Sequence, residues 1–259
     1  MLRPFSIFII LVFLLFSCSS LKQESKDLPA EIKIDGRADE WKQSFTFYEK
    51  KQIYLAVAND EENLYICLKA NDQNLIKQVP RTGLTLWVDQ DVGSDRELGV
   101  KFPVGLVGEG IDREELSKLR DQNPEEKKEF LMKNMDEIVI IRGEEKEKVL
   151  MSLAKHEGVE AAFDINRFEL LYEIKIPING NHFFNVNLNE SKTISIGFET
   201  TDIRKLIQDM QFQGGFSRGM TGGRGGMGGG RGGMGGGRGM SQRPEIPDQF
   251  KFWIDLQLK

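Results

Sequence analysis

Short stretches in which hydrophobic and polar residues alternate recur along most of the chain. The alternation runs through residues 53–57, breaks at a polar turn over residues 59–63 and resumes at residues 64–68. Because successive side chains of a strand point to opposite faces, this pattern predicts a β-hairpin with one buried face. A shorter alternation at Ile32 and Ile34, just before the turn signal Asp35-Gly36, predicts another strand.

The same kind of pattern continues to the end of the chain. Further strands are predicted at residues 84–88, around Val100, and in the stretches EIVIIRG (137–143), VLMSL (149–153), VEAAFDI (159–165), RFELLYEIKIPI (167–178), KTISIGFETTD (192–202) and FKFWIDLQLK (250–259). Many short alternating strands separated by polar turns are typical of all-β proteins. We therefore predict one all-β domain over residues 31–259, an antiparallel two-sheet β-sandwich of jelly-roll or immunoglobulin-like type.

Two segments interrupt this pattern. Residues 112–135 contain REELSKLRDQ and PEEKKEFLMKNM, which are rich in helix-forming residues, and Asn123-Pro124 has the form of a capped helix start. We expect a small helical insertion there. Residues 214–243 consist mainly of Gly, Arg and Met and lie between two predicted strands, so we expect a disordered loop within the domain.

The beginning of the chain has the features of an exported protein. Arg3 precedes an apolar run from Phe5 to Phe16, which is short for a membrane span and has the length of a signal-peptide core. The stretch Leu15-Phe16-Ser17-Cys18 resembles the bacterial lipobox, which implies cleavage after residue 17 and attachment of lipid to Cys18. An uncleaved anchor, or an ordinary signal with an incidental cysteine, is the alternative.

We therefore expect a signal peptide over residues 1–17 and a polar tether over residues 18–30. The lipid, palmitate among its acyl chains, would attach the protein to a bacterial membrane in the cell envelope, with the outer membrane as the expected site. Whether the domain faces the periplasm or the cell surface stays open. The other cysteine, Cys67, lies in an apolar strand-like stretch and is expected to be a buried thiol.

The charge balance changes how the Gly-rich loop is interpreted. The 259 residues include 35 Lys and Arg against 40 Asp and Glu, giving −5, and loss of Arg3 with the signal leaves −6. An acidic, exported body disfavours nucleic acid as a partner of the loop. Three interpretations of the loop remain. It is a flexible loop without a ligand, its arginines bind a polyanion, or its methionines bind Cu(I). The arginines that would hold a polyanion are Arg218, Arg224, Arg231, Arg238 and Arg243.

Several motifs, taken in order, resemble the family-nine carbohydrate-binding modules and the related DOMON-like sandwiches. They are IDGRADEW (34–41), DEENLYICLKAND (60–72), LTLWVDQD (84–91), YEIKIPI (172–178), ISIGFETTD (194–202) and the closing FKFWIDLQL (250–258). The resemblance covers the chain from about residue 28 to its end. It implies a two-sheet β-sandwich that is usually non-catalytic and is often found in glycan-handling proteins outside the cytoplasm.

The chain departs from that family at the sugar clamp. The family's sugar-binding members carry one Trp just before the strand that matches LTLWVD and another in the loop before the last strand. Here the first place holds Pro80-Arg81-Thr82-Gly83 and the second holds the Gly-rich segment. Arg81 and Trp87 remain as candidate ligand-binding residues. Trp87 alternates with the aliphatic residues of its strand, so it either stacks on a planar ligand or packs under the insertion.

The turn DQDVGSDRE is a candidate calcium site. Asp89, Asp91, Asp95 and Glu97 supply hard oxygen ligands at close spacing, although the EF-hand pattern is not met. A plain solvated turn is the alternative. We find no catalytic triad, no phosphate-binding glycine motif and no paired carboxylates in the sequence, so we expect a non-enzyme that needs no other cofactor.

These observations favour a lipid-anchored, non-catalytic envelope β-sandwich that binds carbohydrate or another ligand. The membrane is expected as a partner through the lipid, and a glycan or polyanion as a partner of the domain. The alternative is a structural or assembly lipoprotein whose basic Gly-rich loop contacts a protein or anionic envelope lipid.

Overall fold

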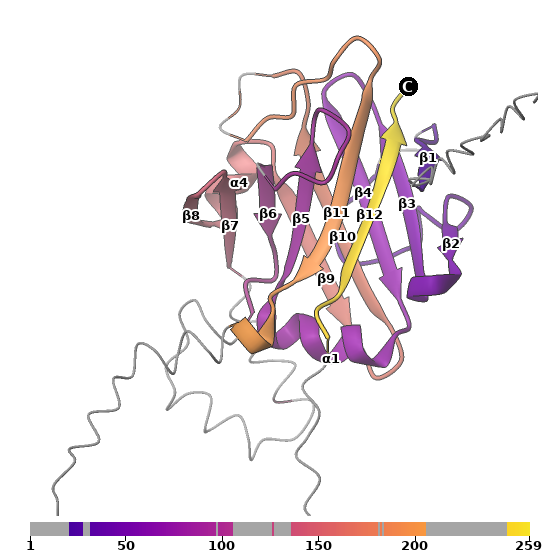
Figure 1. Ribbon diagram of the computed structural model, residues 1–259, viewed down its shortest axis with the longest axis vertical. Coiled ribbons are helices and arrows are strands. Elements are labelled where there is room, and N and C mark those ends of the chain that lie inside the picture. Colours follow the sequence, from indigo (N-terminus) through magenta and orange to yellow (C-terminus); the bar gives the residue numbers. More distant parts are fainter. Residues whose placement is uncertain are drawn as a thin grey trace, which may run out of the picture.

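Two β-sheets pack face to face in the computed structural model (Figure 1). The structure describes residues 21–27, 32–96, 98–105, 126, 136–180, 182, 184–205 and 248–259. The expected insertion (112–135, apart from Glu126), the Gly-rich segment (214–243) and the signal with Cys18 lie outside these residues. No helix in the described part of the chain is long and apolar enough to span a membrane.

The larger sheet has seven strands in the order β1-β12-β11-β5-β6-β7-β8. Their bounds are Lys22–Glu24 (β1), Lys251–Gln257 (β12), Thr193–Thr200 (β11), Leu84–Asp89 (β5), Leu98–Lys101 (β6), Glu137–Arg142 (β7) and Glu145–Leu150 (β8). Every neighbouring pair in this sheet is antiparallel except β1 and β12, which are parallel.

The smaller sheet has five strands in the order β2-β3-β4-β10-β9, all antiparallel. Their bounds are Thr46–Tyr48 (β2), Ile53–Asn59 (β3), Asn63–Ala70 (β4), Leu170–Pro177 (β10) and Glu160–Ile165 (β9). A 3-10 turn (Glu49–Lys51) joins β2 to β3. The prediction of an all-β, two-sheet sandwich is therefore confirmed, and the hairpin at residues 53–68 is β3 and β4.

The alternating hydrophobic residues of both sheets meet between them and form one large core. Leu86 on β5, Phe198 on β11 and Ile254 on β12 face Leu68 on β4 and Tyr172 on β10 as members of the same buried cluster. The core fixes which residues of each strand point outward, because a shift of one residue would exchange the two faces. On the outer face of the seven-stranded sheet, residues of neighbouring strands therefore lie side by side in rows across the strands.

Trp41 anchors a segment that covers the outer face of the five-stranded sheet. It is fully buried against Ala56, Cys67 and Leu171. Its indole Nε1 donates to Oε1 of Glu173 at 2.7 Å, and the backbone N–H of Gly36 donates to Oε2 of the same carboxylate at 2.7 Å. The alternation at Ile32 and Ile34 forms no strand, because the turn is held by this carboxylate rather than by a sheet partner.

The structure corrects the prediction that residues 18–30 are a free tether, because residues 22–24 form strand β1. Residues 22–24 pair with residues 255–257 of β12, and Ser25 continues the contact by donating its backbone N–H to the Gln257 carbonyl at 2.9 Å. Lys26 then forms an isolated bridge to Ala58 of the other sheet. The polar composition suggested a free linker, but short edge strands need no hydrophobic pattern when their contribution is backbone pairing.

Two helices in the described part of the chain were not predicted. Helix α1 (Gln73–Thr82) lies across one end of the sandwich (Figure 1), and the side chain of Asp72 caps it by accepting the N–H of Leu75 at 2.7 Å. Pro80 stands in its last turn, which disguised the helix in the sequence. Helix α4 (Met151–His156) begins inside the predicted strand VLMSL, so that stretch is divided between β8 and α4.

Tyr172 provides a test of the core. Its hydroxyl is fully buried and has no hydrogen-bond partner among the residues that the structure describes, and burial raises the pKa of this phenol far above its ordinary value. Removing an unsatisfied buried hydroxyl without changing the ring should stabilise the fold. We expect Tyr172→Phe to raise the free energy of unfolding by about 1 kcal/mol, measured by urea denaturation; a loss of stability would show that the hydroxyl has a partner.

Candidate functional site

Two tryptophans lie in one row on the outward face of the seven-stranded sheet. Trp253 of β12 pairs with Gly197 of β11, and Gly197 pairs on its other side with Trp87 of β5. Trp87 pairs in turn with Gly99 of β6. Neighbouring strands are ~4.8 Å apart, so the tryptophan backbones stand roughly 10 Å apart. We call this row of Trp253, Gly197, Trp87 and Gly99 the tryptophan face.

Each tryptophan ring lies over the glycine of the next strand. A Cβ atom built on Gly197 would come within 2.3–2.6 Å of three atoms of the Trp253 ring, and one on Gly99 within 2.8 Å of two atoms of the Trp87 ring. No side chain fits at either position without moving the indole. The glycines therefore allow both rings to lie down on the sheet in the same direction, which leaves a flat aromatic surface.

An ion pair holds the edge of Trp253. Glu199, beside it on β11, accepts the Trp253 Nε1–H at 3.0 Å. Arg96, from the loop before β6, donates its Nε–H to Oε2 of Glu199 at 3.0 Å and an Nη2–H to Oε1 at 2.6 Å. The Arg96 guanidinium lies 5.9 Å from the Trp253 ring centroid, at the outer limit of a cation–π contact. The bidentate contact fixes the orientation of both Arg96 and the indole.

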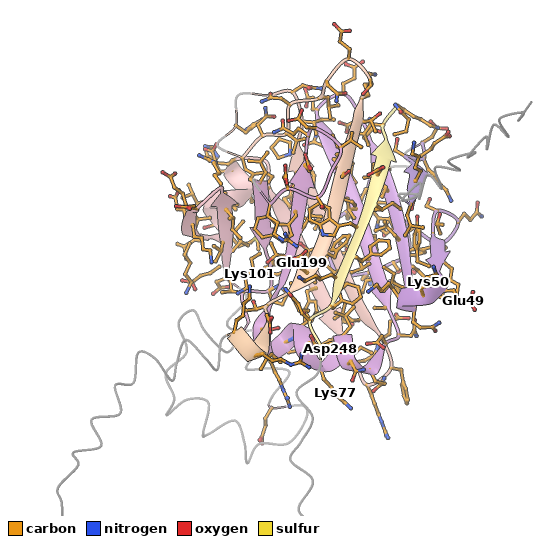
Figure 2. All side chains as sticks on the ribbon, viewed as in Figure 1. Glu49, Lys50, Lys77, Lys101, Glu199 and Asp248 are labelled. Carbon is orange, nitrogen blue, oxygen red and sulfur yellow. The ribbon has the colours of Figure 1, made fainter. Side chains whose placement is uncertain are left out.

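The side chains of Glu199 and Arg96 differ in their exposure to solvent. The Glu199 side chain is 6% exposed, whereas that of Arg96 is 45% exposed. Burial alone would raise the pKa of Glu199, but the hydrogen bonds from Arg96 and Trp253 bring this pKa below its ordinary value. The carboxylate in turn raises the pKa of Arg96. An ionised, anchored guanidinium thus stands partly open to solvent beside the aromatic surface. Figure 2 shows Glu199 near Lys101, which lies in the same row two strands away.

Replacing Glu199 with glutamine is expected to cost more stability at neutral pH than in acid. The folded-state pKa lies below the ordinary value of 4.5, so the carboxylate stabilises the fold above pH 4.5. That contribution is lost as the pH falls through the lowered pKa. Urea unfolding of both proteins between pH 7 and pH 3 should show a gap that narrows in acid; an unchanged gap would contradict this ion pair.

Trp87 points outward, as the alternation predicted, and it is partly buried. Its ring packs against a small outer cluster of Val104, Val139 and Ile141. Its Nε1 is buried and has no hydrogen-bond partner in the described part of the chain. Because an unsatisfied buried donor costs free energy, this N–H would gain from an ordered water or a ligand oxygen.

A polar pocket adjoins the tryptophan face at the β1 end of β12. It has a volume of about 390 Å³. Its lining includes Lys22 and Glu24 of β1, Val92 of the β5–β6 loop and Asp255 of β12. The Asp255 carboxylate accepts the Ser195 hydroxyl at 2.6 Å. Since Asp255 and Trp253 are on the same face of β12, the pocket extends the aromatic surface with polar groups.

The candidate calcium residues have a local structural role. Oxygens of the Asp89 carboxylate accept the backbone N–H of Asp91 at 2.9 Å and that of Asp95 at 3.0 Å, which closes the β5–β6 loop. Among the described residues no three His, Cys, Asp or Glu side chains are grouped to hold a metal. Glu97 lies outside the described residues, and calcium stays a prediction.

The other candidates fall elsewhere. Arg81 is exposed in the last turn of α1, at the end of the sandwich rather than on the sheet face. Arg218, Arg224, Arg231 and Arg238 lie outside the described residues. Cys67 is free and fully buried, as predicted, and burial raises the pKa of its thiol.

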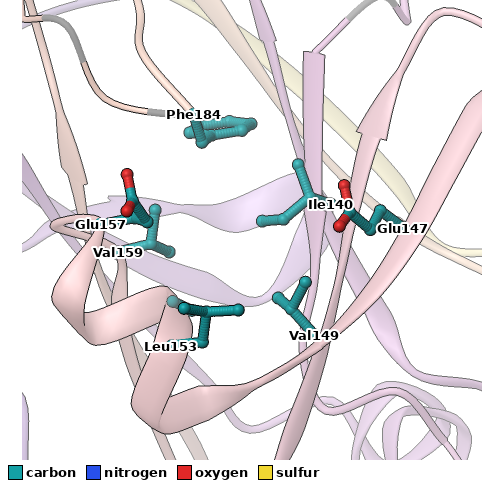
Figure 3. Close-up of a pocket in the computed structure, with 8 residues that line it drawn as sticks. Ile140, Glu147, Val149, Leu153, Glu157, Val159 and Phe184 are labelled. Atoms are coloured by element: carbon teal, nitrogen blue, oxygen red, sulfur yellow. The ribbon is translucent and has the colours of Figure 1, made fainter.

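A second, smaller pocket lies at the far edge of the sandwich. It holds about 130 Å³ between β8 and α4. Figure 3 shows apolar side chains lining it with two carboxylates at its sides; the lining residues named there are Ile140, Val149, Leu153, Val159, Phe184, Glu147 and Glu157. Ile140 belongs to the main core, so this pocket opens into the sandwich edge and is separate from the tryptophan face.

Three residues of the site were not found from the sequence. Trp253 alternates with Phe252 and Ile254, so its outward direction follows from the sequence, but its place beside Trp87 follows only from the registers of β5, β11 and β12. Arg96 and Glu199 are 103 positions apart in the chain. The glycine facing outward in ISIGFET was a usable signal, because a glycine inside a strand marks the close approach of another group.

Comparison with known proteins gives weak likenesses to carbohydrate-binding modules. No family model and no curated protein matches the chain. A family 9 carbohydrate-binding module from Caldicellulosiruptor kristjanssonii, in complex with cellotriose, is similar at 9% identity, 70% coverage of this chain, 76% coverage of its own and a TM-score of 0.33. Its glucose complex gives 9%, 70%, 78% and 0.32.

A third structure, from Bacteroides uniformis, is of a protein to which carbohydrate binding is attributed. It is 11% identical, with 70% of this chain and 84% of that chain covered, and its TM-score is 0.35. The family in the first two structures is the one that the sequence motifs resemble. At such TM-scores the likeness assigns neither a ligand nor a site to this chain.

Proposed function

We propose that this protein is a lipid-anchored, non-catalytic module of the cell envelope that binds carbohydrate on the tryptophan face. The observation that carries the proposal is the pair of indole rings on one sheet face, each laid over a glycine, on strands whose backbones are about 10 Å apart. Broad apolar rings beside polar groups suit a sugar, whose ring has an apolar face and hydroxyls at its edge.

The polar groups beside the rings fit the hydroxyls and charges of a glycan. Arg96 presents an exposed guanidinium fixed by Glu199, and the adjoining pocket contributes Lys22, Glu24 and Asp255. Trp87 adds an N–H that has no hydrogen-bond partner among the described residues. Together these groups offer both donors and acceptors around a flat surface, so the site suits the chemistry of neutral and of acidic sugars.

The lipid anchor is supported by the signal-like run and by Cys18. The structure of the described residues is compatible with export of a single folded domain that starts close behind the cysteine. Because the places of the family's clamp tryptophans hold other residues, we propose the open sheet face as the place where a sugar is held. That difference makes the proposed site specific to this chain's own residues.

A glycan array followed by calorimetry on residues 19–259 tests the proposal. We expect at least one neutral or acidic oligosaccharide to bind, and binding to compete with other ligands of the same class. No binding across the array would overturn the proposal. Capture of a protein partner that depends on residues 217–240, together with an empty array, would instead favour the structural alternative based on the Gly-rich loop.

A further inference from the structure

The smaller pocket, between β8 and α4, is mostly apolar. Six of the eight residues that line it are hydrophobic, among them Leu153 and Ala154 of α4 and Phe184. Ala154 and Phe184 are buried members of the main core, whereas Leu153 is 53% exposed. The pocket therefore runs from the core to the surface. A concave apolar lining with a few polar groups is the usual form of a small-molecule site.

A charged residue occupies a core-facing position beside this pocket. Glu147 of β8 pairs with Ile140 of β7, so both side chains lie on the sheet face that Ile140 turns toward the core. The Glu147 side chain has no ion-pair or hydrogen-bond partner within the described part of the chain. Its carboxylate and that of Glu157 flank the apolar lining (Figure 3). A ligand that enters the pocket therefore meets a negative potential.

Two lysines near the pocket are held by other carboxylates. Lys148 of β8 forms an ion pair with Glu137 of β7. Lys155 of α4 lies 2.9 Å from the carboxylate of Glu160 at the start of β9. These two ammonium groups are therefore engaged away from Glu147, and the charge of Glu147 remains for a cation that comes from outside the domain.

Exposed leucines stand at the mouth of the pocket. Leu150 is 57% exposed and Leu153 is 53% exposed, and they are two of the six large hydrophobic residues that are exposed in the described part of the chain. Leu150 ends β8 and precedes α4, and Leu153 lies in α4. Apolar side chains gathered at a pocket on the surface mark a place where a ligand with an apolar part is bound.

We propose that this pocket binds an amine whose apolar body is about the size of one benzene ring. The pocket volume is about 130 Å³. An apolar cavity of about 150 Å³ in another protein holds benzene, so the size fits. The apolar body packs against the lining, and the ammonium group at the rim donates to Glu147. This site is separate from the tryptophan face, so it does not depend on the binding of a glycan.

Methyl NMR with three probes of similar size tests this inference. Residues 19–259, which contain every described strand and helix, would be labelled at the methyl groups of Ile, Leu and Val and titrated with benzylamine, benzyl alcohol and benzoate. We expect benzylamine to shift the signals of Val149, Leu153 and Val159, and to leave that of Ile194 in place. Benzyl alcohol should bind about fivefold more weakly, because it lacks the ion pair, and benzoate should not bind.

Three results would overturn the proposal. The first is that benzylamine leaves the pocket methyl signals unmoved. The second is that benzyl alcohol binds as tightly as benzylamine, which would show that the carboxylates do not select the ligand. The third is that benzoate binds. None of these results depends on whether a sugar binds to the tryptophan face, so the two proposals fail separately.

Glu147→Gln provides the matched variant, because it removes the charge and keeps the shape of an exposed side chain. It should weaken the binding of benzylamine about fivefold and leave that of benzyl alcohol unchanged. Glu145→Gln lies on the same strand outside the pocket lining and should change neither. If the inward charge serves only to keep the β8 edge from pairing with another sheet, Glu147→Gln will promote self-association without affecting benzylamine, which would overturn the proposal.

Discussion

Replacing Trp41 with alanine is expected to lower the free energy of unfolding by about 4 kcal/mol. The side chain is fully buried and packs against Ala56 and Cys67 of the five-stranded sheet. Its removal leaves a cavity beneath residues 32–45. It also takes one donor from the Glu173 carboxylate, which is completely buried.

The matched variant is Trp41→Phe, which keeps most of the apolar volume and removes the N–H. Its cost should be smaller, in the range of about 1–3 kcal/mol for a lost partner of a buried polar group. Chemical denaturation of the two variants and the parent chain measures both values. If alanine at this position cost less than phenylalanine, packing and the Glu173 contact could not be what fixes the segment.

Replacing Trp253 with alanine is expected to weaken glycan binding by about 30-fold. Buried aromatic anchors of binding sites commonly contribute about 2 kcal/mol or more, and each 1.4 kcal/mol corresponds to tenfold in affinity. Trp253 is only partly buried and lies outside the main core, so the folded state should persist. Calorimetry with the best oligosaccharide from the array measures the change.

Two controls sharpen this prediction. Phe168→Ala removes an aromatic side chain that is 69% exposed and lies in the turn between β9 and β10, so binding should not change. Gly197→Ala keeps Trp253 but places a methyl group against its ring, so binding should fall although the tryptophan is present. Loss of binding in Phe168→Ala, or full binding in Trp253→Ala, would show that the ligand lies elsewhere.

The alternation of hydrophobic residues was sufficient for the sandwich and for the outward direction of Trp87. It depends only on which side chains a strand buries, and the core of Leu86, Phe198 and Ile254 follows it closely. The same alternation indicates that the Trp253 side chain also points outward. Its place beside Trp87 could not be predicted, because this row depends on the registers of three strands, and β12 begins at Lys251, 51 positions after β11 ends at Thr200.

Other parts of the fold are set by contacts that leave little trace in the sequence. Strand β1 is three residues long and joins the sheet through backbone pairing with β12, so no side-chain pattern announces it. Glu173 looks like an ordinary outward residue of β10. It is buried because the turn at Gly36 and the ring of Trp41 cover it, which is a property of the tertiary structure alone.

The chain contains only three tryptophans, so one NMR experiment addresses the central claim directly. The indole N–H resonances of Trp41, Trp87 and Trp253 would be followed while residues 19–259 are titrated with a neutral trisaccharide, cellotriose, and an acidic one, trigalacturonate. The account predicts that one of these sugars shifts the Trp87 and Trp253 signals and leaves that of Trp41 in place. Binding that leaves the Trp87 and Trp253 signals unmoved would contradict it.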